Sequence, residues 1–353
     1  ILSRAAGQLT THQSQLTIPM FTDTLSRPLR DLRISVTDRC NFRCRYCMPA
    51  EIFSEGYEFL PKPEILTLEE IARFARIFCS LGVEKLRLTG GEPLLRRGLP
   101  DLITMLSEIP GEHDIAMTTN ATSLARYAKK LKAAGLHRVT ISLDALDPAI
   151  FGRMNGTGAS PERVIEGIDS ALEHGLGVKV NSVIQKGVNE DQVFALAEFA
   201  RERKVTLRFI EFMDTGNTNG WKLDQVVPYT EMVKDLHQHF PLEPIDPNYP
   251  GETARRFRYK DFPDQEIGFI TSVSRPFCSD CNRARLSADG QIFTCLFASH
   301  GHDLKTALRD GASDEQITNL IRSVWSVRDD RYSELRTEIG GTQIKPEMSY
   351  IGG

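Results

Sequence analysis

The sequence predicts an α/β fold in which six consecutive βα units build a parallel sheet, followed by a C-terminal α+β region. Three observations support this prediction. Between positions 29 and 214, short runs rich in β-branched residues alternate with amphipathic helical patterns. Gly82, Gly135 and Gly175 follow three of the helical patterns, where glycine commonly caps a helix C-terminus. After Trp221 the alternation stops and a proline-rich segment begins.

The six predicted strands span residues 29–37, 84–89, 113–119, 138–143, 177–184 and 205–212. Helices are predicted between them over residues 67–81, 99–109, 123–134, 161–174 and 190–203. Parallel units with right-handed crossovers form either an open sheet or a partial (β/α) barrel. Six units do not support a complete eight-unit barrel.

The C-terminal region has a different pattern. A proline-rich loop is expected around residues 241–250, then a strand over 267–274 and a hairpin over 283–295 that turns at Asp289-Gly290. Two helical stretches follow at 304–309 and 314–326, before a polar tail that ends Ser-Tyr-Ile-Gly-Gly. This region therefore reads as a separate unit appended to the parallel sheet.

Composition excludes several classes of protein. The 43 Lys and Arg residues against 47 Asp and Glu give a net charge of -4, which offers no broad basic field for nucleic acid or an anionic membrane. No stretch of about 18 apolar residues exists, so no membrane span is expected. The first 22 residues lack a secretory signal pattern, and the cysteine count is odd. We therefore expect a cytoplasmic protein.

Three cysteines lie close together just after the first predicted strand, at Cys40, Cys44 and Cys47. Parallel βα folds place their chemistry at this end of the strands. Three thiolates can hold an iron-sulfur cluster that normally takes four, which leaves one iron open for a ligand. The alternatives are a zinc loop and unrelated buried cysteines. The spacing of three residues, then two, is the one found in radical S-adenosylmethionine (SAM) enzymes.

The second predicted strand ends in Thr89-Gly90-Gly91-Glu92-Pro93, which resembles the second signature of the same superfamily. Two glycines let the backbone approach a ligand closely, and Glu92 can accept hydrogen bonds from an amino group. The alternative reading is a tight turn between a strand and a helix.

Cys278, Cys281 and Cys295 form a second triad, because the predicted hairpin can bring Cys295 back to the other two. Structural zinc with His300 or His302 as a fourth ligand is one interpretation. However, the segment from Phe277 to Leu286 reads FCSDCNRARL. That string resembles the second-cluster domain of the molybdenum-cofactor biosynthesis protein A family, the GTP 3',8-cyclases.

Cations recur along the predicted strands, flanked by apolar residues. Strands buried on both faces normally read as continuous apolar runs, so repeated charge indicates a bound polyanion rather than a simple core. A triphosphate balances several cations that would otherwise each be costly to bury. The alternative is that some of them pair with acids such as Glu211. The residues concerned are Arg33, Lys85, Arg87, Lys179, Arg208, Arg283 and Arg285, with Asn181 on the face of Lys179.

The resemblance to the GTP 3',8-cyclases extends from about residue 28 to the end of the chain. It implies an incomplete (β/α)6 TIM-type barrel with a C-terminal α+β second-cluster domain. The domains implied are an N-terminal extension over 1–25, the barrel over 26–220, an iron-sulfur domain closing it over 221–340, and a tail over 341–353. One departure is Ala121, where the family commonly has glycine.

The resemblance also implies the cofactors and the site. Cys40, Cys44 and Cys47 would hold one [4Fe-4S] cluster that binds SAM, and the second triad would hold another that meets the guanine ring. The implied SAM contacts are Tyr46, Gly91, Glu92, Ser142 and Met213. The implied GTP contacts are Arg33, Lys85, Arg87, Thr118, Lys179, Asn181, Arg208, Arg283 and Arg285. The implied catalytic set is Arg283, Arg285, Gly352 and Gly353, the two glycines reaching into the barrel.

By the same resemblance, a 5'-deoxyadenosyl radical would take the ribose 3'-hydrogen of GTP, and the product would be 3',8-cyclo-7,8-dihydro-GTP. The implied partners are GTP, a reductant such as a flavodoxin or ferredoxin, and a downstream cyclic pyranopterin monophosphate synthase; a homodimer stays open. Two other interpretations stay open as well. One is a radical SAM enzyme acting on a peptide, and the other is a zinc-stabilised nucleotide-binding module without redox chemistry.

Overall fold

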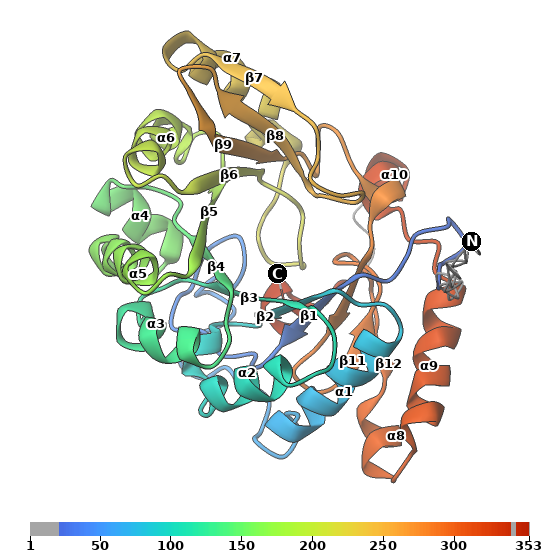
Figure 1. The fold of residues 1–353 in the computed structure, drawn as a ribbon. Helices are drawn as coiled ribbons and strands as arrows, with labels where there is room; N and C mark the ends of the chain where they lie inside the picture. Colours follow the sequence, from blue (N-terminus) through green and yellow to red (C-terminus); the bar gives the residue numbers. More distant parts are fainter. Residues whose placement is uncertain (1–20, 340–343, 353) are drawn as a thin grey trace, which may run out of the picture.

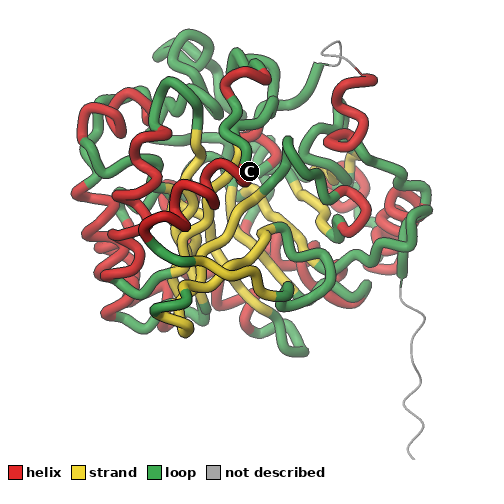
Figure 2. The backbone as a smooth tube through the Cα atoms, turned by 90° about the horizontal axis from the view of Figure 1, so that it is seen from above, coloured by secondary structure: helices red, strands yellow, loops and turns green. Residues whose placement is uncertain are grey.

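The computed structural model describes residues 21–339 and 344–352. Its strands form one twelve-stranded sheet in the order β12-β11-β10-β1-β2-β3-β4-β5-β6-β9-β8-β7. The sheet curves, and helices α1 to α6 cover its outer face (Figure 1). Seen from above, the strands occupy the middle of the molecule with helices around them (Figure 2). The predicted α/β fold with an incomplete barrel is therefore confirmed, and the open-sheet alternative is not.

Six parallel strands lie next to one another in chain order, as predicted. They are β1 (Asp31–Ser35), β2 (Lys85–Thr89), β3 (Asp114–Thr119), β4 (Arg138–Ser142), β5 (Gly177–Ile184) and β6 (Thr206–Glu211). The predicted helices appear as α1 (Leu68–Ser80), α2 (Leu99–Ser107), α3 (Leu124–Ala133), α5 (Glu162–Glu173) and α6 (Val193–Glu202). Each lies within a few residues of its predicted bounds.

Helix α1 shows how the sequence sets these elements. The Thr67 side chain accepts a hydrogen bond from the Glu70 backbone N–H, and the Glu70 carboxylate accepts one from the Thr67 N–H, which forms a capping box. Ile71, Phe74 and Phe78 form a stripe that is fully buried against the sheet. The helix is thus fixed at its start by polar caps and along its length by apolar packing.

Helix α4 (Pro148–Asn155) was not predicted. It is only two turns long, so its apolar residues make no recognisable period. Its start nevertheless follows the rules, because the Asp147 carboxylate accepts hydrogen bonds from the N–H groups of Ala149 and Ile150 at 2.9 Å each. Pro148 occupies the first helical position, where its missing N–H costs nothing.

The C-terminal part of the chain continues the sheet at both edges. Strand β10 (Arg283–Leu286) pairs in parallel with β1, and β9 (Phe262–Ile270) pairs in parallel with β6. The remaining strands are β7 (Leu242–Ile245), β8 (Ala254–Tyr259), β11 (Gln291–Phe293) and β12 (His302–Asp303). The remaining helices are α7 (Tyr229–His239), α8 (Lys305–Arg309), α9 (Asp314–Ser326), α10 (Tyr332–Ile339) and α11 (Met348–Ile351). The predicted domain boundaries stay predictions.

Two local predictions in this region were wrong. The proline-rich loop contains strand β7, in which Pro244 lies opposite Phe257. Because β7 is the last strand of the sheet, one side of it needs no ladder hydrogen bonds, and proline is tolerated there. The strand predicted to reach residue 274 ends at Ile270, because the backbone N–H groups of Val273 and Ser274 turn to donate to the Glu211 carboxylate.

The two faces of the parallel strands differ in character. Alternate side chains such as Leu32, Leu86 and Val139 are fully buried against the surrounding helices. The other set points to the inside of the barrel and is largely polar, as described below. Among the described helices, none has the length and apolar character needed to cross a membrane.

Candidate active site

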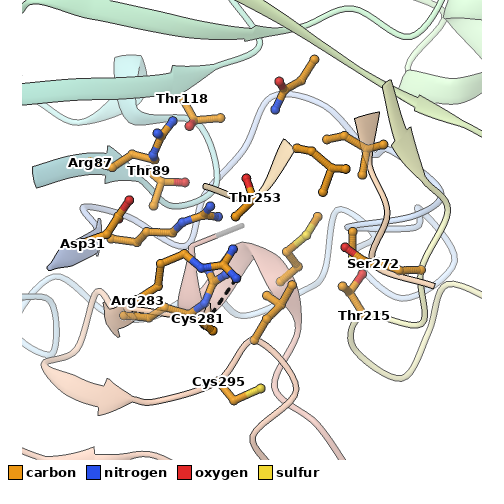
Figure 3. Close-up of a pocket in the computed structure, with 18 of the residues that line it drawn as sticks. Asp31, Arg87, Thr89, Thr118, Thr215, Thr253, Ser272, Cys281, Arg283 and Cys295 are labelled. Carbon is orange, nitrogen blue, oxygen red and sulfur yellow. Dashed lines mark hydrogen bonds between the residues drawn. The ribbon is translucent and has the colours of Figure 1, made fainter. Parts of the chain in front are cut away.

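The inside of the barrel encloses a cavity of about 940 Å³. Figure 3 shows Arg87, Thr89, Thr118, Asp31, Arg283, Cys281 and Cys295 brought together around it from distant parts of the chain. Nineteen of the residues predicted for the site line this cavity: the six triad cysteines, Arg33, Lys85, Arg87, Thr118, Asn181, Arg208, Arg283, Arg285, Tyr46, Gly91, Glu92, Ser142 and Met213. Lys179 and Gly352 are not among the lining residues, and Gly353 lies outside the described residues.

The first cysteine loop is held by one of its own side chains. The Arg43 guanidinium donates to the Phe53 carbonyl oxygen at 2.6 Å and to the Cys40 carbonyl oxygen at 2.8 Å. The Arg43 N–H donates to the Asn155 carbonyl oxygen at the end of α4. A Cβ on Gly156, where φ is +67°, would lie 2.1 Å from the Arg43 carbonyl oxygen. The loop is therefore fixed against α4 by a contact that only glycine permits.

The predicted glycine pair packs against this same loop. A Cβ on Gly91 would lie 2.1 Å from the Arg39 carbonyl oxygen, and one on Gly90 would lie 2.3 Å from the Thr37 carbonyl oxygen. The Glu92 N–H donates to the Arg39 carbonyl oxygen at 2.8 Å. In this structure the two positions require glycine because the backbone of the cysteine loop approaches them closely. An approach to a ligand stays a prediction.

Glu92 is buried and already holds three donors. Its carboxylate accepts from the Thr119 hydroxyl at 2.7 Å, the Asn120 N–H at 2.7 Å and the Leu94 N–H at 3.0 Å. Burial raises the pKa of this carboxyl, and the hydrogen bonds oppose the rise. Glu92 thereby joins the ends of β2 and β3 at the cavity wall. The next residue in that turn, Ala121, has φ +59°, the left-handed region in which glycine is preferred.

Asp144 is a site residue that the sequence analysis did not assign. The Tyr46 hydroxyl donates to its Oδ2 at 2.8 Å, and the Val183 N–H donates to its Oδ1 at 2.8 Å. Burial raises the pKa of Asp144 to about 6. Asp144 belongs to the polar end of β4, which suits a ligand contact, but that signal is weak on its own because about half of such residues only cap a helix.

The second triad lies in a strongly cationic environment. Burial alone would raise the pKa of the Cys281 thiol, but Arg283 and Arg328 outweigh burial and lower it to about 6. Arg283 donates to the Cys281 sulfur at 3.3 Å, the contact drawn in Figure 3. Burial raises the pKa of Cys295 to about 12. His300 and His302, the zinc ligands of the alternative reading, do not line the cavity.

The register of the sheet explains how the cations gather. Arg33 lies directly opposite Arg87 on β2 and Arg285 on β10. Because side chains alternate along a strand, all three face the same side. The next strands add Arg208 beside Asn181, with the Arg208 guanidinium donating to the Asn181 amide oxygen at 2.9 Å.

Within the described residues, none of the seven predicted cations makes an ion pair with an aspartate or glutamate. The buried Nε atoms of Arg33, Arg87 and Arg283 have no hydrogen-bond partner there. Glu211, proposed above as a partner for these cations, instead accepts hydrogen bonds from Tyr229, Val273 and Ser274. Pairing with Glu211 therefore does not explain the cations.

Burial lowers the pKa values of most of these groups, and neighbouring cations add to that effect. The pKa of Arg208 falls to about 9, first through burial and then through Arg87. The pKa of Arg285 falls to about 10, through burial and Arg283. Lys179, which lies opposite Thr140 on the inner face, has a pKa lowered to about 8 by burial and Arg208. Such a cluster is stabilised by an anion of high charge.

The tail reaches the same cations. The Arg285 guanidinium donates to the carbonyl oxygen of Gly352. A Cβ on Gly352, where φ is +75°, would lie 2.4 Å from the Thr89 side chain. Gly352 is buried, and it lies against Thr89 and Arg285, two residues that line the cavity. Entry of the tail into the barrel stays a prediction.

The residues present fit two iron-sulfur clusters. Each triad supplies three thiols to the wall of one large cavity, and thiolates are the donors that such clusters take. Among the described residues, no three Cys, His, Asp or Glu side chains converge closely enough to hold a single ion. The donor set of three thiols in each triad therefore suits an iron-sulfur cluster.

Comparison with known families gives two matches that together span the described sheet. Residues 34–200 match the Radical SAM superfamily, and residues 205–334 match the family described as Molybdenum Cofactor Synthesis C. The boundary between the two matches falls just before β6. The first cysteine triad lies in the first match and the second triad in the other.

Curated relatives resemble nearly the whole chain. A "GTP 3',8-cyclase" of Acidothermus cellulolyticus is 51% identical, over 94% of this chain and 98% of that protein. A protein of the same name from Staphylococcus aureus is 49% identical, with the same coverage of each chain.

Solved structures resemble the fold at much lower identity. The crystal structure of Streptococcus suis SuiB bound to S-adenosylmethionine matches with a TM-score of 0.60 and 16% identity, over 91% of this chain and 77% of that one. SuiB bound to its precursor peptide SuiA matches with a TM-score of 0.58 and 17% identity, over 88% and 66%. At this identity the likeness shows the fold alone.

Proposed function

Because the chain belongs to the family of GTP 3',8-cyclases, radical SAM enzymes of molybdenum cofactor biosynthesis, we propose that its cavity converts GTP to 3',8-cyclo-7,8-dihydro-GTP between two [4Fe-4S] clusters. The observation that carries this proposal is the set of inward cations without acidic partners among the described residues, enclosed between two cysteine triads. A peptide substrate or a zinc-stabilised module gives no reason for those cations.

The cations select a polyanionic substrate. Each buried guanidinium without a partner costs several kcal/mol, so binding a triphosphate stabilises many at once. Arg138 provides the contrast, because it also faces inward but donates to Asp114 at 2.9 Å. We assign GTP contacts to Arg33, Lys85, Arg87, Thr118, Lys179, Asn181, Arg208, Arg283 and Arg285.

The two triads have different tasks in this proposal. Cys40, Cys44 and Cys47 hold the cluster that binds SAM, beside Tyr46, Gly91, Glu92, Ser142 and Met213. Cys278, Cys281 and Cys295 hold the cluster that faces the guanine base. When bound, the first cluster and SAM supply the 5'-deoxyadenosyl radical that takes the ribose 3'-hydrogen of GTP. A reductant such as a flavodoxin or ferredoxin supplies the electron, and a cyclic pyranopterin monophosphate synthase in the cytoplasm uses the product.

The chain's own residues fix the reacting groups and exclude water. The Arg283 and Arg285 side chains lie between the second triad and the tail, so they can hold GTP at the second cluster. Gly352 packs against Thr89 at the cavity wall, where a side chain would not fit. Enclosure of this kind protects a radical from side reactions and fixes the distance between the reacting atoms.

The test is transfer of a label from the ribose. Anaerobic enzyme is incubated with SAM, a chemical reductant and GTP deuterated at the 3' position, and 5'-deoxyadenosine is analysed by mass spectrometry. We expect deuterium in 5'-deoxyadenosine with 3'-labelled GTP and none with 2'-labelled GTP as the matched control. Unlabelled 5'-deoxyadenosine from the 3'-labelled substrate would exclude the proposed reaction.

A further inference from the structure

A buried ion cluster lies behind the second cysteine triad and takes no part in the functions assigned above. It consists of Asp23, Arg27 and Arg328, whose side chains are between 0% and 2% exposed. Asp23 Oδ2 accepts from the Arg27 Nε at 2.6 Å and from the Arg328 guanidinium at 2.9 Å. Asp23 Oδ1 accepts from the backbone N–H groups of Leu25 and Arg27. The carboxylate therefore orients both arginines.

Both arginines also donate hydrogen bonds to backbone carbonyl oxygens at or next to the cysteines of the second triad. Arg27 donates to the Cys278 carbonyl oxygen at 2.8 Å. Arg328 donates to the Cys281 carbonyl oxygen at 2.8 Å and to the Thr294 carbonyl oxygen at 3.1 Å. Thr294 directly precedes Cys295. The cluster thus touches the backbone at or beside all three cysteines of the second triad.

Further contacts of Trp325 and Thr24 hold the two arginines in place. The Trp325 indole N–H donates to the Arg27 carbonyl oxygen at 3.2 Å, and the Arg328 guanidinium lies 4.5 Å from the centre of the Trp325 ring. The Thr24 hydroxyl donates to the Arg328 carbonyl oxygen at 2.7 Å. The segment around Arg27 is joined here to two segments that lie more than 250 residues further along the chain, so the cluster is not a by-product of local secondary structure.

One donor in the cluster is left over. The Nη2 atom of Arg27 is buried without a hydrogen-bond partner among the described residues. Both arginines line the cavity. Asp330 is the second carboxylate near the pair: its Oδ2 lies 3.5 Å from the Arg328 Nε, and its carbonyl oxygen accepts from Arg27 at 2.7 Å. A cluster held by the three thiols would bring an acceptor for the unpaired nitrogen of Arg27.

We propose that Asp23, Arg27 and Arg328 are positioning residues for the second cluster: they hold the backbone of its three cysteines at the spacing the cluster needs. The inference rests on the proposed function, because it requires a cluster at the second triad. Substitution of a residue that orients a metal ligand without binding the metal itself typically changes metal affinity by about 10- to 100-fold.

The experiment separates the two clusters by making two parent chains. In the first parent, Cys40, Cys44 and Cys47 are changed to serine, so that reconstituted iron reports the second triad only. In the second parent, Cys278, Cys281 and Cys295 are changed to serine, so that iron reports the first triad and the integrity of the fold. Arg328→Gln, Arg328→Lys and Asp23→Asn are placed in each parent, with Arg322→Gln as control. Arg322 lies exposed on α9, six residues before Arg328 in the chain.

The readout is the rate at which a chelator removes iron from anaerobically reconstituted protein. In the first parent we expect Arg328→Gln and Asp23→Asn to accelerate iron loss by about 10- to 100-fold. Arg328→Lys should accelerate it nearly as much, because one ammonium cannot reach Asp23 and two carbonyl oxygens together. In the second parent all variants should lose iron at the parent rate, and Arg322→Gln should do so in both.

Three outcomes would overturn the inference. Unchanged iron loss from the first parent carrying Arg328→Gln would show that the second cluster does not depend on these residues. Equal acceleration in both parents would show a general loss of stability instead of positioning. If the first parent never took up iron, the chain would have no second cluster, and the proposed function would be wrong as well.

Discussion

The Arg285 guanidinium donates a hydrogen bond to the main-chain carbonyl oxygen of Gly352. Arg285 lies on β10, in the hairpin that leads to Cys295, so this bond connects the C-terminal tail to the wall of the cavity. Gly352 lies at φ +75° against the Thr89 side chain, at the C-terminal end of β2. A strand end, a hairpin arginine and the tail therefore meet at one point. Thr89 and Arg285 both line the cavity, so this point lies at its wall.

Gly352→Ala should uncouple the formation of 5'-deoxyadenosine from the cyclisation of GTP. The new Cβ would lie 2.4 Å from Thr89 Cγ2, so the tail has to move away from Arg285. A displacement of about 1 Å in a positioned site costs roughly 10²-fold in rate. We expect the cyclised product to fall by that factor while 5'-deoxyadenosine still forms, measured together by chromatography.

Gly175→Ala is the control for this substitution. Gly175 has a similar φ of +71°, but a Cβ there meets nothing within 4 Å. It should keep the ratio of product to 5'-deoxyadenosine. Equal losses in the two variants would mean that backbone strain, and not the position of the tail, explains the effect.

Arg87→Gln should weaken GTP binding. The Arg87 Nε is buried without a partner among the described residues, and a hydrogen bond to a charged group contributes about 1.5–3 kcal/mol. We expect the Kd for GTP, measured by calorimetry on the anaerobic protein, to rise about 10- to 100-fold.

Arg138→Gln is the comparison, because Arg138 faces the same interior but is paired with Asp114. Its loss should lower the melting temperature more than the affinity for GTP, since it leaves Asp114 without its partner. If Arg138→Gln weakened GTP binding as much as Arg87→Gln does, the distinction between paired and unpaired cations would be wrong.

Lys179 should make GTP binding depend on pH. Burial and Arg208 lower its pKa from 10.5 to about 8. The unfolded chain thus binds more protons than the folded chain between pH 8 and 10.5, and the contribution of this group to stability rises with pH across that window. A bound triphosphate favours the protonated lysine, so binding takes up a proton above pH 8.

The expected size follows from that pKa. Between pH 7 and 8.5 the Kd for GTP should rise roughly fourfold through Lys179. Lys179→Gln should bind more weakly at pH 7 and lose this rise. A wild-type slope that persists unchanged in Lys179→Gln would assign the titration to another group.

Gly91→Ala should disturb the first triad. A Cβ at this position would lie 2.1 Å from the Arg39 carbonyl oxygen, and the backbone around Cys40 has to shift. We expect the variant to lose SAM affinity and most of the iron at the first triad after reconstitution. Gly56→Ala is the matched control, because a Cβ there meets nothing within 4 Å. Full iron at the first triad of Gly91→Ala would contradict this account of the glycine pair.

Much of the fold could be predicted because its signals are local. Strands such as β2 and β4 are indicated by alternating polar and apolar residues, and α1 by its capping box and apolar stripe. Period-two alternation was enough to place Arg33 and Arg87 on one face, and the register sets them side by side. Cysteine spacing alone indicated the first triad, whereas the second also needed the predicted hairpin that returns Cys295 to Cys278 and Cys281.

What could not be predicted depends on contacts across the chain. Asp23 and Arg328 are 305 residues apart, and nothing near either position signals the other. The bond between Tyr46 and Asp144 likewise appears only when two loops meet. Strand β7 was hidden because Pro244 normally argues against a strand, and only its place at the sheet edge permits it.

The central claim is that two clusters face one GTP cavity, and iron with sulfide per chain tests it most directly. After anaerobic reconstitution the wild-type chain should hold about eight iron and eight sulfide, and Cys278→Ala about four of each. Cys79→Ala should match the wild type, since Cys79 lies on α1 outside both triads. About four iron in the wild type, unchanged by Cys278→Ala, would contradict the claim.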